Sequence, residues 1–201
     1  MTIRIAVSAA ALLGLAACGG GGDSSIGSEA ASRFVALDAE FDRVVDANPI
    51  LAAPSIPSSG TADFSGVMLV GSDLQPGTTT PAYLGDTSIT VNFDSGALTG
   101  EANSFVFVDL NAGINPQGVN TSVGNDGAVT STDVMFTATV TGVDFSPEFS
   151  GFIDEKELSG TASGEFLGTS AEYIQIFESC ASCDFEFDGN PTDLVVWATE
   201  D

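Results

Sequence analysis

Two cysteines near the end of the chain are the residues best suited to redox or metal chemistry. Cys180 and Cys183 lie in the stretch FESCASCDFEF, with only Ala181 and Ser182 between them. Residues directly opposite one another in a hairpin lie about 5.5 Å apart at their Cα atoms, which a disulfide can span. We therefore predict a disulfide between these two cysteines. A redox pair or half of a metal site is the alternative, but a reactive pair needs a helix N-terminus, and the neighbouring phenylalanines alternate as in a strand.

The third cysteine, Cys18, follows an apolar segment at the start of the chain. This segment contains Arg4, a nearly continuous apolar run from Ile5 to Leu15, and the small Ala16 and Ala17. Such a layout is typical of a secretory signal peptide and is too short for a permanent membrane span. The Leu-Ala-Ala-Cys ending resembles the bacterial lipobox. That resemblance implies that diacylglycerol is attached to the Cys18 thiol, that the chain is cut before it, and that the new amine is acylated. An ordinary signal peptide beside an incidental cysteine is the alternative.

The residues after Cys18 are typical of a flexible tether. The sequence GGGGDSSIGS runs from Gly19 to Ser28, and chains rich in glycine and serine behave as flexible coils. Two or three acyl chains on one cysteine suffice for stable anchoring. By resemblance to lipoproteins with glycine after the cysteine, Gly19 implies the outer membrane. We therefore expect a lipoprotein signal peptide over residues 1–17, a lipidated cysteine and tether over residues 18–28, and attachment to the outer membrane.

The charge balance excludes several classes of function. The chain carries 28 acidic residues against four basic ones, has no histidine, and has a net charge of −24. After removal of the signal peptide only Arg33, Arg43 and Lys156 are basic, so we predict no nucleic acid partner. Without histidine, neither a Ser-His-Asp nor a Cys-His arrangement can form, and the usual zinc sites are missing. We therefore predict a protein that is not an enzyme, with no catalytic residues, no cofactor and no metal site. Solubility or a salty medium explains the acidity best, and a basic partner is the alternative.

Three loops rich in Asp and Asn oxygens could bind calcium. They lie at Val108–Asn120, Gly124–Asp133 and Phe187–Asp193. Their spacing matches no EF-hand, and Asn, Asp and Gly are also the residues that turns require. We predict turns.

The folded part begins with a helix. Five apolar residues recur at helical spacing between Glu29 and Ala47, with charged residues on the other side, and Asn48-Pro49 ends the pattern. We predict that this apolar stripe packs against a sheet, and a helix that binds a partner is the alternative. Residues 29–60 thus form a helix and a linker. The stripe consists of Phe34, Leu37, Phe41, Val44 and Val45.

From Thr61 onward the apolar residues alternate with polar ones, which predicts strands. No helical pattern separates these segments, so the sheet is expected to be antiparallel. Inward glycines and alanines between Glu157 and Leu167 favour a barrel, and a membrane-spanning barrel needs more interfacial aromatics than one Trp and two Tyr. We predict an all-β domain over residues 61–201: a single antiparallel barrel of eight or nine strands, or a barrel-like sandwich, preceded by one short amphipathic helix. The strands are expected at Thr61–Val70, Pro81–Leu84, Ile89–Phe93, Ala97–Asp109, Asp133–Gly142, Glu157–Leu167, Ala171–Ser179, Cys183–Asp188 and Asp193–Thr199.

Two stretches resemble a known family. LSGTASGEFLGTSAEYI resembles the closing signature of the transferrin-binding protein B type of barrel, with Phe166, Gly168, Ala171 and Glu172 at the matching places. ITVNFDSGALTGEA is similar to the hairpin that precedes it. The family consists of surface lipoproteins in which an eight-stranded barrel follows a lipobox and a glycine-rich tether. The resemblance covers Thr61 to Phe177. The chain departs from the family members that carry two lobes, each with a handle domain and a barrel, because it has room for one barrel and no handle domain. A C-terminal hairpin extension over Glu178 to Asp201 is a further departure.

This resemblance implies that the chain acts as a ligand- or protein-binding module. The implied partners are an extracellular protein, an iron-related solute or an outer-membrane receptor. Tyr83 and Tyr173 are the only phenolate candidates for an iron ligand, and we predict that both are barrel residues instead. A structural cell-envelope lipoprotein without a small ligand is the alternative.

Overall fold

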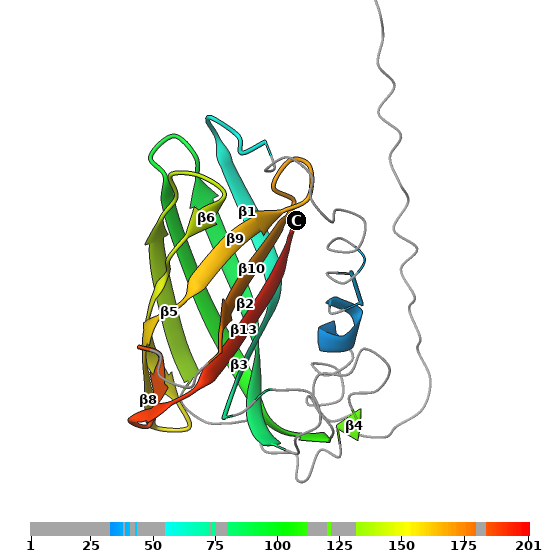
Figure 1. Cartoon of the computed structure of the whole chain (residues 1–201), viewed down its shortest axis with the longest axis vertical. Helices are drawn as coiled ribbons and strands as arrows, with labels where there is room; N and C mark the ends of the chain where they lie inside the picture. The colour runs from blue at the N-terminus through cyan, green and yellow to red at the C-terminus, as the bar shows by residue number, and fades with distance from the viewer. Residues whose placement is uncertain are drawn as a thin grey trace, which may run out of the picture.

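Figure 1 shows a computed structural model of the chain, in which the alternating segments form one antiparallel sheet. The structure describes residues 33–37, 39–40, 43, 55–72, 74, 80–111, 120–121, 132–179 and 184–201. The all-β class and the antiparallel sheet are confirmed. The strands are β1 Thr61–Gly71, β2 Thr80–Asn92, β3 Ala97–Asn111, β4 Asn120–Thr121, β5 Thr132–Thr139, β6 Asp144–Phe145, β7 Glu148–Ile153, β8 Lys156–Thr161, β9 Ser163–Leu167, β10 Tyr173–Glu178, β11 Glu186–Phe187, β12 Asn190–Pro191 and β13 Asp193–Glu200.

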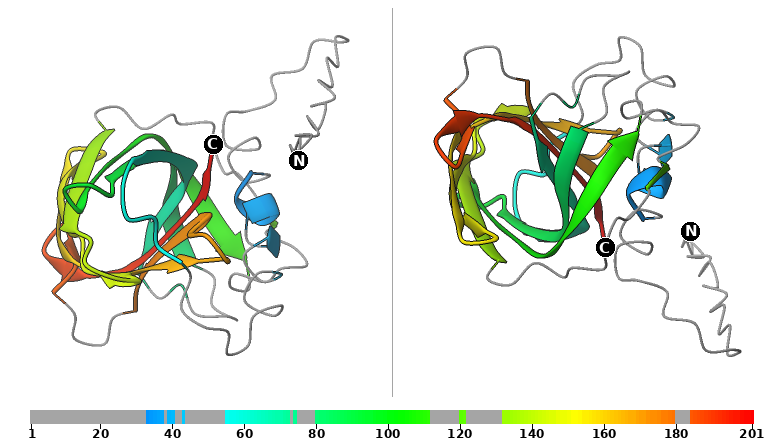
Figure 2. Two further views of the ribbon diagram at one scale, coloured as in Figure 1. Left: turned by 90° about the horizontal axis from the view of Figure 1, so that it is seen from above. Right: turned by 90° about the horizontal axis from the view of Figure 1, so that it is seen from below.

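Two bent strands close the sheet into a barrel. Ala162 alone separates β8 from β9, and Ser146 and Pro147 separate β6 from β7. The Ala162 amide donates to the Pro147 carbonyl at 3.1 Å, so these four strands form one bent hairpin. β8 pairs with β7, and β9 pairs with β10. The other pairs lead from β7 through β5, β3, β2, β1 and β13 to β10. The hydrogen-bonded path thus returns to its start, and Figure 2 shows the ring.

The predicted number of strands, eight or nine, is wrong, because the described residues alone form thirteen. The bends at Pro147 and Ala162 split two strands into four, and Pro147 has no amide hydrogen to donate to a ladder. The strands β6 and β7 and the two-residue strands β4 and β12 were not predicted, whereas β11 lies within the segment expected at Cys183–Asp188. In contrast, the separate strands expected at Pro81–Leu84 and from Ile89 are one strand, β2, whose register shifts between Leu84 and Asp86.

The C-terminal residues differ from the expected hairpin extension. β13 pairs with β1 on one side and β10 on the other, so it is part of the barrel wall. Among the described residues after β10, the short β11–β12 hairpin is the part that lies outside this ring, where β11 pairs with β8.

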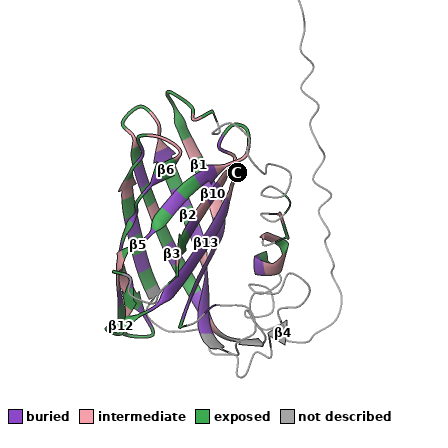
Figure 3. Cartoon of the chain, viewed as in Figure 1, coloured by how far each residue is buried: buried purple, intermediate pink, exposed green. Residues whose placement is uncertain are grey.

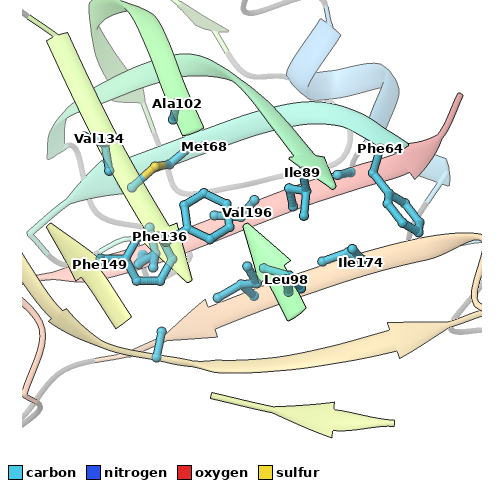
Figure 4. Packing of buried hydrophobic residues seen from close by; sticks show 14 of the residues in the cluster. Phe64, Met68, Ile89, Leu98, Ala102, Val134, Phe136, Phe149, Ile174 and Val196 are labelled. Atoms are coloured by element: carbon cyan, nitrogen blue, oxygen red, sulfur yellow. The ribbon is translucent and has the colours of Figure 1, made fainter. Parts of the chain in front are cut away.

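The barrel interior is a continuous aromatic and aliphatic core. Figure 4 shows that side chains from β1, β2, β3, β5, β7, β10 and β13 point toward one another. Phe136 and Phe149 stack with their ring centroids 4.7 Å apart, and Phe149 meets Phe185 edge-on at 5.5 Å. The Phe136 ring also fills the space above Gly100, its register partner, where any Cβ would overlap it. The predicted inward face of residues 157–167 is confirmed at four of its five positions, because Leu158, Ala162, Gly164 and Phe166 are buried, whereas Gly160 is half-buried.

A second apolar cluster lies on the outer side of β1, β2, β3 and β13, beneath the N-terminal helix (Figure 3). In β1, Met68 and Val70 face the interior cluster, whereas Val67 and Leu69 face the outer one. The Phe34 ring stacks on Trp197 with the centroids 5.0 Å apart, and Phe34 is buried. The prediction that the helix packs on the sheet is therefore confirmed.

Polar contacts at both ends of the described helical residues fix the helix to the barrel. Arg33 pairs with Asp86 of β2 at 2.7 Å, and the Tyr173 hydroxyl donates to Glu40 at 2.8 Å. The helical residues described are 33–37, 39–40 and 43, whereas Phe41, Val44 and Val45 lie outside the described residues.

Candidate ligand pocket at one end of the barrel

A pocket of about 450 Å³ lies at the end of the barrel where β1 ends and β8 begins. Val70, Tyr83 and Phe107 form a cross-strand row in its wall, because Tyr83 is the register partner of Val70 on β1 and of Phe107 on β3. Pockets of 300–1,000 Å³ are typical of sites for small molecules. The other lining residues are Gly71, Ser72, Lys156, Phe187, Asp188, Asn190 and Thr192.

Three aromatic rings form the apolar surface of the pocket. The Tyr83 ring meets Phe107 edge-on with the centroids 5.5 Å apart, and meets Phe187 at 5.4 Å. Tyr83 is buried, while Phe107 and Phe187 are partly exposed and pack against the interior cluster. The rings therefore extend the barrel core outward and end in a surface that a ligand can reach.

The single lysine of the chain, Lys156, lies beside these rings. Its Nζ donates to the Tyr83 hydroxyl oxygen at 3.3 Å and lies 5.7 Å and 5.8 Å from the centroids of Tyr83 and Phe187. The Tyr83 hydroxyl in turn donates to the Asp154 carboxylate at 3.3 Å. The hydrogen bond with Tyr83, together with the nearby carboxylates of Asp154 and Asp188, raises the pKa of Lys156. The lysine is therefore charged at neutral pH.

Two tight turns hold the polar rim of the pocket. Asp154 and Glu155 both have a positive φ, as do Asp188 and Gly189, a conformation typical of two-residue hairpin turns. The first turn contains Asp154 and is followed directly by Lys156, the first residue of β8. The second joins β11 to β12 and is fixed by a 2.9 Å hydrogen bond from the Asn190 side-chain Nδ2 to the Asp188 backbone carbonyl. The prediction that the loop Phe187–Asp193 forms a turn is confirmed, whereas most of the other two acidic loops lies outside the described residues.

Another hollow, of about 470 Å³, lies at β6, β9 and β10 and has a different chemical character. Asp144 and Glu165 are register partners there, and burial together with the Asp144 charge raises the pKa of Glu165. Phe177, 44% exposed, lies at its edge. Like charges directly opposite one another destabilise a sheet, and within the described part of the chain no basic side chain lines this hollow.

The predicted site residues Cys18, Cys180 and Cys183 lie outside the described residues. The strands on either side of the cysteine pair, β10 and β11, are not paired with each other: β10 pairs with β9 and β13, and β11 with β8 and β12. The hairpin on which we based the disulfide is therefore not formed by these strands, and the disulfide stays a prediction. Among the described residues, no group of three or more carboxylates or cysteines is arranged to hold a metal ion. No helix within that same part is long and apolar enough to cross a membrane.

The residues that carry the family resemblance form the turn between β9 and β10. Phe166 is buried in the barrel, and Gly168 and Ala171 have positive φ values of 90° and 63°. The Glu172 carboxylate accepts hydrogen bonds from the Ser170 amide at 2.9 Å and from the Thr169 hydroxyl at 3.0 Å. This motif therefore closes a tight turn and does not face the pocket.

Sequence reasoning missed the pocket because its parts are far apart along the chain. Tyr83, Lys156 and Phe187 come from β2, β8 and β11, and only closure of the barrel brings them together. The prediction that Tyr83 is a barrel residue is confirmed by its burial. One signal could have pointed to the site: Lys156 is the only basic residue of the chain after Arg43.

The similarity of this chain to known proteins is a similarity of three-dimensional structure. No protein-family model matches the chain, and no curated protein matches it. Two solved structures of transferrin-binding protein B from Haemophilus parasuis, one a tryptophan-to-alanine mutant and the other a double mutant, are similar to this chain at 16% identity, with TM-scores of 0.42 and 0.40. Each match covers 74% of this chain and 28% of the other. Intact Ap-TbpB, with its N and C lobes, is similar at 14% identity and a TM-score of 0.38, over 73% of this chain and 27% of that one.

Proposed function

We propose that the chain is a lipid-anchored binding protein of a bacterial outer membrane, whose barrel end binds a small solute. The observation that carries the proposal is the pocket of about 450 Å³ lined by Tyr83, Phe107, Phe187 and Lys156. A largely apolar pocket with a few convergent polar groups is the default binding site of a protein. The support for the anchor is the lipobox-like segment that ends at Cys18, followed by four glycines.

The proposed role is binding without catalysis. The chain has no histidine, and the polar groups of the pocket are a lysine, an aspartate, an asparagine and two hydroxyl side chains besides tyrosine. The proposal includes no cofactor and no nucleic acid. An iron-related solute is one candidate ligand that the family resemblance suggests.

A protein partner, such as an outer-membrane receptor or an extracellular protein, is the second candidate. Its support is the pair Met135 and Phe152 on the outer wall, which are 61% and 53% exposed. They lie diagonally across β5 and β7, because Met135 pairs with Ser150 and Phe152 pairs with Asp133. A structural envelope lipoprotein without a small ligand stays the alternative.

Native mass spectrometry of the full chain, extracted from membranes with its acyl groups, tests the solute. We expect a bound small molecule on the wild type and on Phe177→Ala, and none on Phe187→Ala. Phe177 is the matched control, because it is exposed, lines the hollow beside β9 and β10, and is not among the residues that line the pocket at the barrel end. The same molecule on all three proteins would overturn the pocket assignment. Peptidoglycan, or nothing at all, on every form would favour the structural alternative.

Metabolic labelling tests the anchor. The wild type should incorporate a palmitate analogue and fractionate with the outer membrane, and Cys18→Ser should lose the label, because the thiol that carries the diacylglycerol is gone. Equal labelling of both proteins would contradict the anchor.

A further inference from the structure

We propose that the pocket at the barrel end binds a small aromatic or alicyclic molecule that carries one carboxylate, with the ammonium of Lys156 as the partner of that carboxylate. This inference rests on the proposed function, because it names the chemical class of the solute that the same pocket takes. It follows from the hydrogen-bonding capacity of Lys156, from the rings beside it, and from the acidic groups around it.

The ammonium of Lys156 has N–H donors that make no hydrogen bond to a described residue. A lysine ammonium has three N–H donors, and among the described residues its one hydrogen bond is the 3.3 Å contact with the Tyr83 oxygen. The two ion pairs found in that part of the chain both use arginines of the N-terminal helix, Arg33 with Asp86 and Arg43 with Glu40. An anionic oxygen in the pocket can therefore accept a charge-assisted hydrogen bond from Lys156 without displacing an existing ion pair.

The three aromatic rings of the pocket indicate the shape of the apolar part of the ligand. Tyr83, Phe107 and Phe187 present ring faces and edges within one pocket, and such surfaces favour a flat or ring-shaped apolar molecule. A cationic ligand is disfavoured, because the place over the Tyr83 and Phe187 rings where a cation binds already holds Nζ of Lys156, 5.7 Å and 5.8 Å from the two centroids.

The acidic surroundings limit the ligand to one negative charge. Asp188 lines the pocket, Asp154 lies within hydrogen-bonding distance of the Tyr83 hydroxyl, and the whole chain carries a net charge of −24. One lysine can balance one carboxylate. The second charge of a phosphate monoester would meet Asp188 and Asp154 without a partner, so a carboxylate fits better than a phosphate.

Three probes that share one ring system separate the effect of charge from that of the ring. Naphthoate, naphthylmethanol and naphthylmethylammonium are titrated by calorimetry into the full chain in lipid nanodiscs, with empty nanodiscs as the blank. The variants are Lys156→Met, which keeps the apolar stem, and Arg43→Gln. Arg43→Gln is the matched control, because it removes the same charge from the N-terminal helix, outside the pocket.

We expect naphthoate to bind the wild type most tightly of the three probes. Its affinity should fall about tenfold or more in Lys156→Met, as for loss of a charge-assisted hydrogen bond. Arg43→Gln should bind naphthoate like the wild type.

A second measurement uses the wild type alone and does not depend on the variant folding. Because Lys156 is the only lysine, carbon-13 labelling of lysine gives a single Cε signal from the chain. Naphthoate should shift this signal in a saturable way, and naphthylmethanol should shift it much less.

Other outcomes distinguish this inference from the proposed function. If naphthylmethanol binds as tightly as naphthoate, and Lys156→Met binds both with unchanged affinity, the pocket recognises the ring alone. The proposed function then stands, and the inference that Lys156 binds a carboxylate is wrong. If naphthylmethylammonium binds best and gains affinity in Lys156→Met, the pocket prefers cations and the inference is overturned. If no probe binds and the lysine signal does not move, the inference fails, and the mass spectrometry of the membrane-extracted protein decides the proposed function on its own.

Discussion

At the level of single residues, buried phenylalanine rings determine how the barrel interior is filled. Phe166 is fully buried and lies near Phe64, Phe93 and Phe145, with ring centroids 6.3 Å, 6.2 Å and 5.1 Å away. The Phe145 ring in turn occupies the space above Gly164, its register partner, where any Cβ would overlap it. A ring removed from this group leaves a cavity that three neighbours cannot fill.

Phe166→Ala should therefore lower the free energy of unfolding by about 3–5 kcal/mol, the range measured for deletion of buried aromatic rings. Denaturant titration measures this change. Phe177→Ala is the control and should have a much smaller effect, because Phe177 is 44% exposed. Equal midpoints for the wild type and Phe166→Ala would place the ring outside the core.

The raised pKa of Glu165 predicts that the stability of the domain depends on pH. Burial and the neighbouring Asp144 raise the pKa of Glu165 above its ordinary value of 4.5. The folded state therefore holds the proton more tightly than the unfolded state, and the charged carboxylate destabilises the fold above the raised pKa. Glu165→Gln should thus stabilise the domain at neutral pH, by less than about 1 kcal/mol, because both Glu165 and Asp144 are exposed and solvent screens their charges. The gain should vanish below pH 4.5, where both states are protonated. Denaturant midpoints at several pH values measure it, and a gain that is equal at all pH values would contradict the charge argument.

At the level of elements, the helix and the strands beneath it depend on each other. β1 and β13 are apolar on both faces because one face lines the barrel and the other lies beneath the helix. The apolar run in β13, from Leu194 to Ala198, is buried throughout. Without the helix, Val67, Leu69 and Trp197 would form an exposed apolar patch of the kind that soluble proteins rarely leave open.

Loss of the Phe34 ring should loosen the helix and expose the only tryptophan. Trp197 is 7% exposed, and Phe34 stacks on its ring. In Phe34→Ala we expect the Trp197 emission to shift to longer wavelength and the domain to lose about 3 kcal/mol, the lower end of the range for a buried ring. Fluorescence and thermal unfolding measure the two effects. Ala36→Ser, at an exposed position of the same helix, should change neither. An unchanged emission maximum in Phe34→Ala would mean that the ring does not cover Trp197.

Alternation predicted most strands but not where they bend or shift. β7 was not predicted, because Phe152 points outward, 53% exposed, and obscures the inward set Phe149 and Ile153. β2 was predicted as two pieces, because its register shift at Leu84 and Asp86 interrupts the pattern of period two. Local sequence encodes alternation, whereas a bulge or a bend depends on the strand alongside.

At the level of the whole molecule, closure of the barrel explains what sequence reasoning could not find. The ring is completed by β13, which joins β1 to β10, and these strands come from opposite ends of the barrel sequence. The pocket also depends on closure of the barrel, since its residues Tyr83 and Lys156 are 73 positions apart in the sequence. The packing of Phe34 and Leu37 on the sheet, the antiparallel sheet and most of the inward face of residues 157–167 follow from local patterns, and these were predicted correctly.

The net charge of −24 predicts how salt affects the whole barrel. In this chain acidic residues outnumber basic ones by 28 to four, so folding brings like charges together. At low salt their repulsion acts over long distances, whereas at 0.1 M salt it is screened beyond the Debye length of about 10 Å. Sodium chloride should therefore raise Tm, by about 3 °C or more between low salt and about 0.5 M, if screening recovers about 1 kcal/mol. Potassium chloride should have the same effect, because screening depends on ionic strength alone.

Calcium chloride at equal ionic strength separates screening from binding. An equal shift in Tm supports turns in the acidic loops, and a much larger shift would show that their carboxylates bind calcium. A Tm that is independent of salt would mean that the acidic side chains are too far apart to repel one another in the folded state.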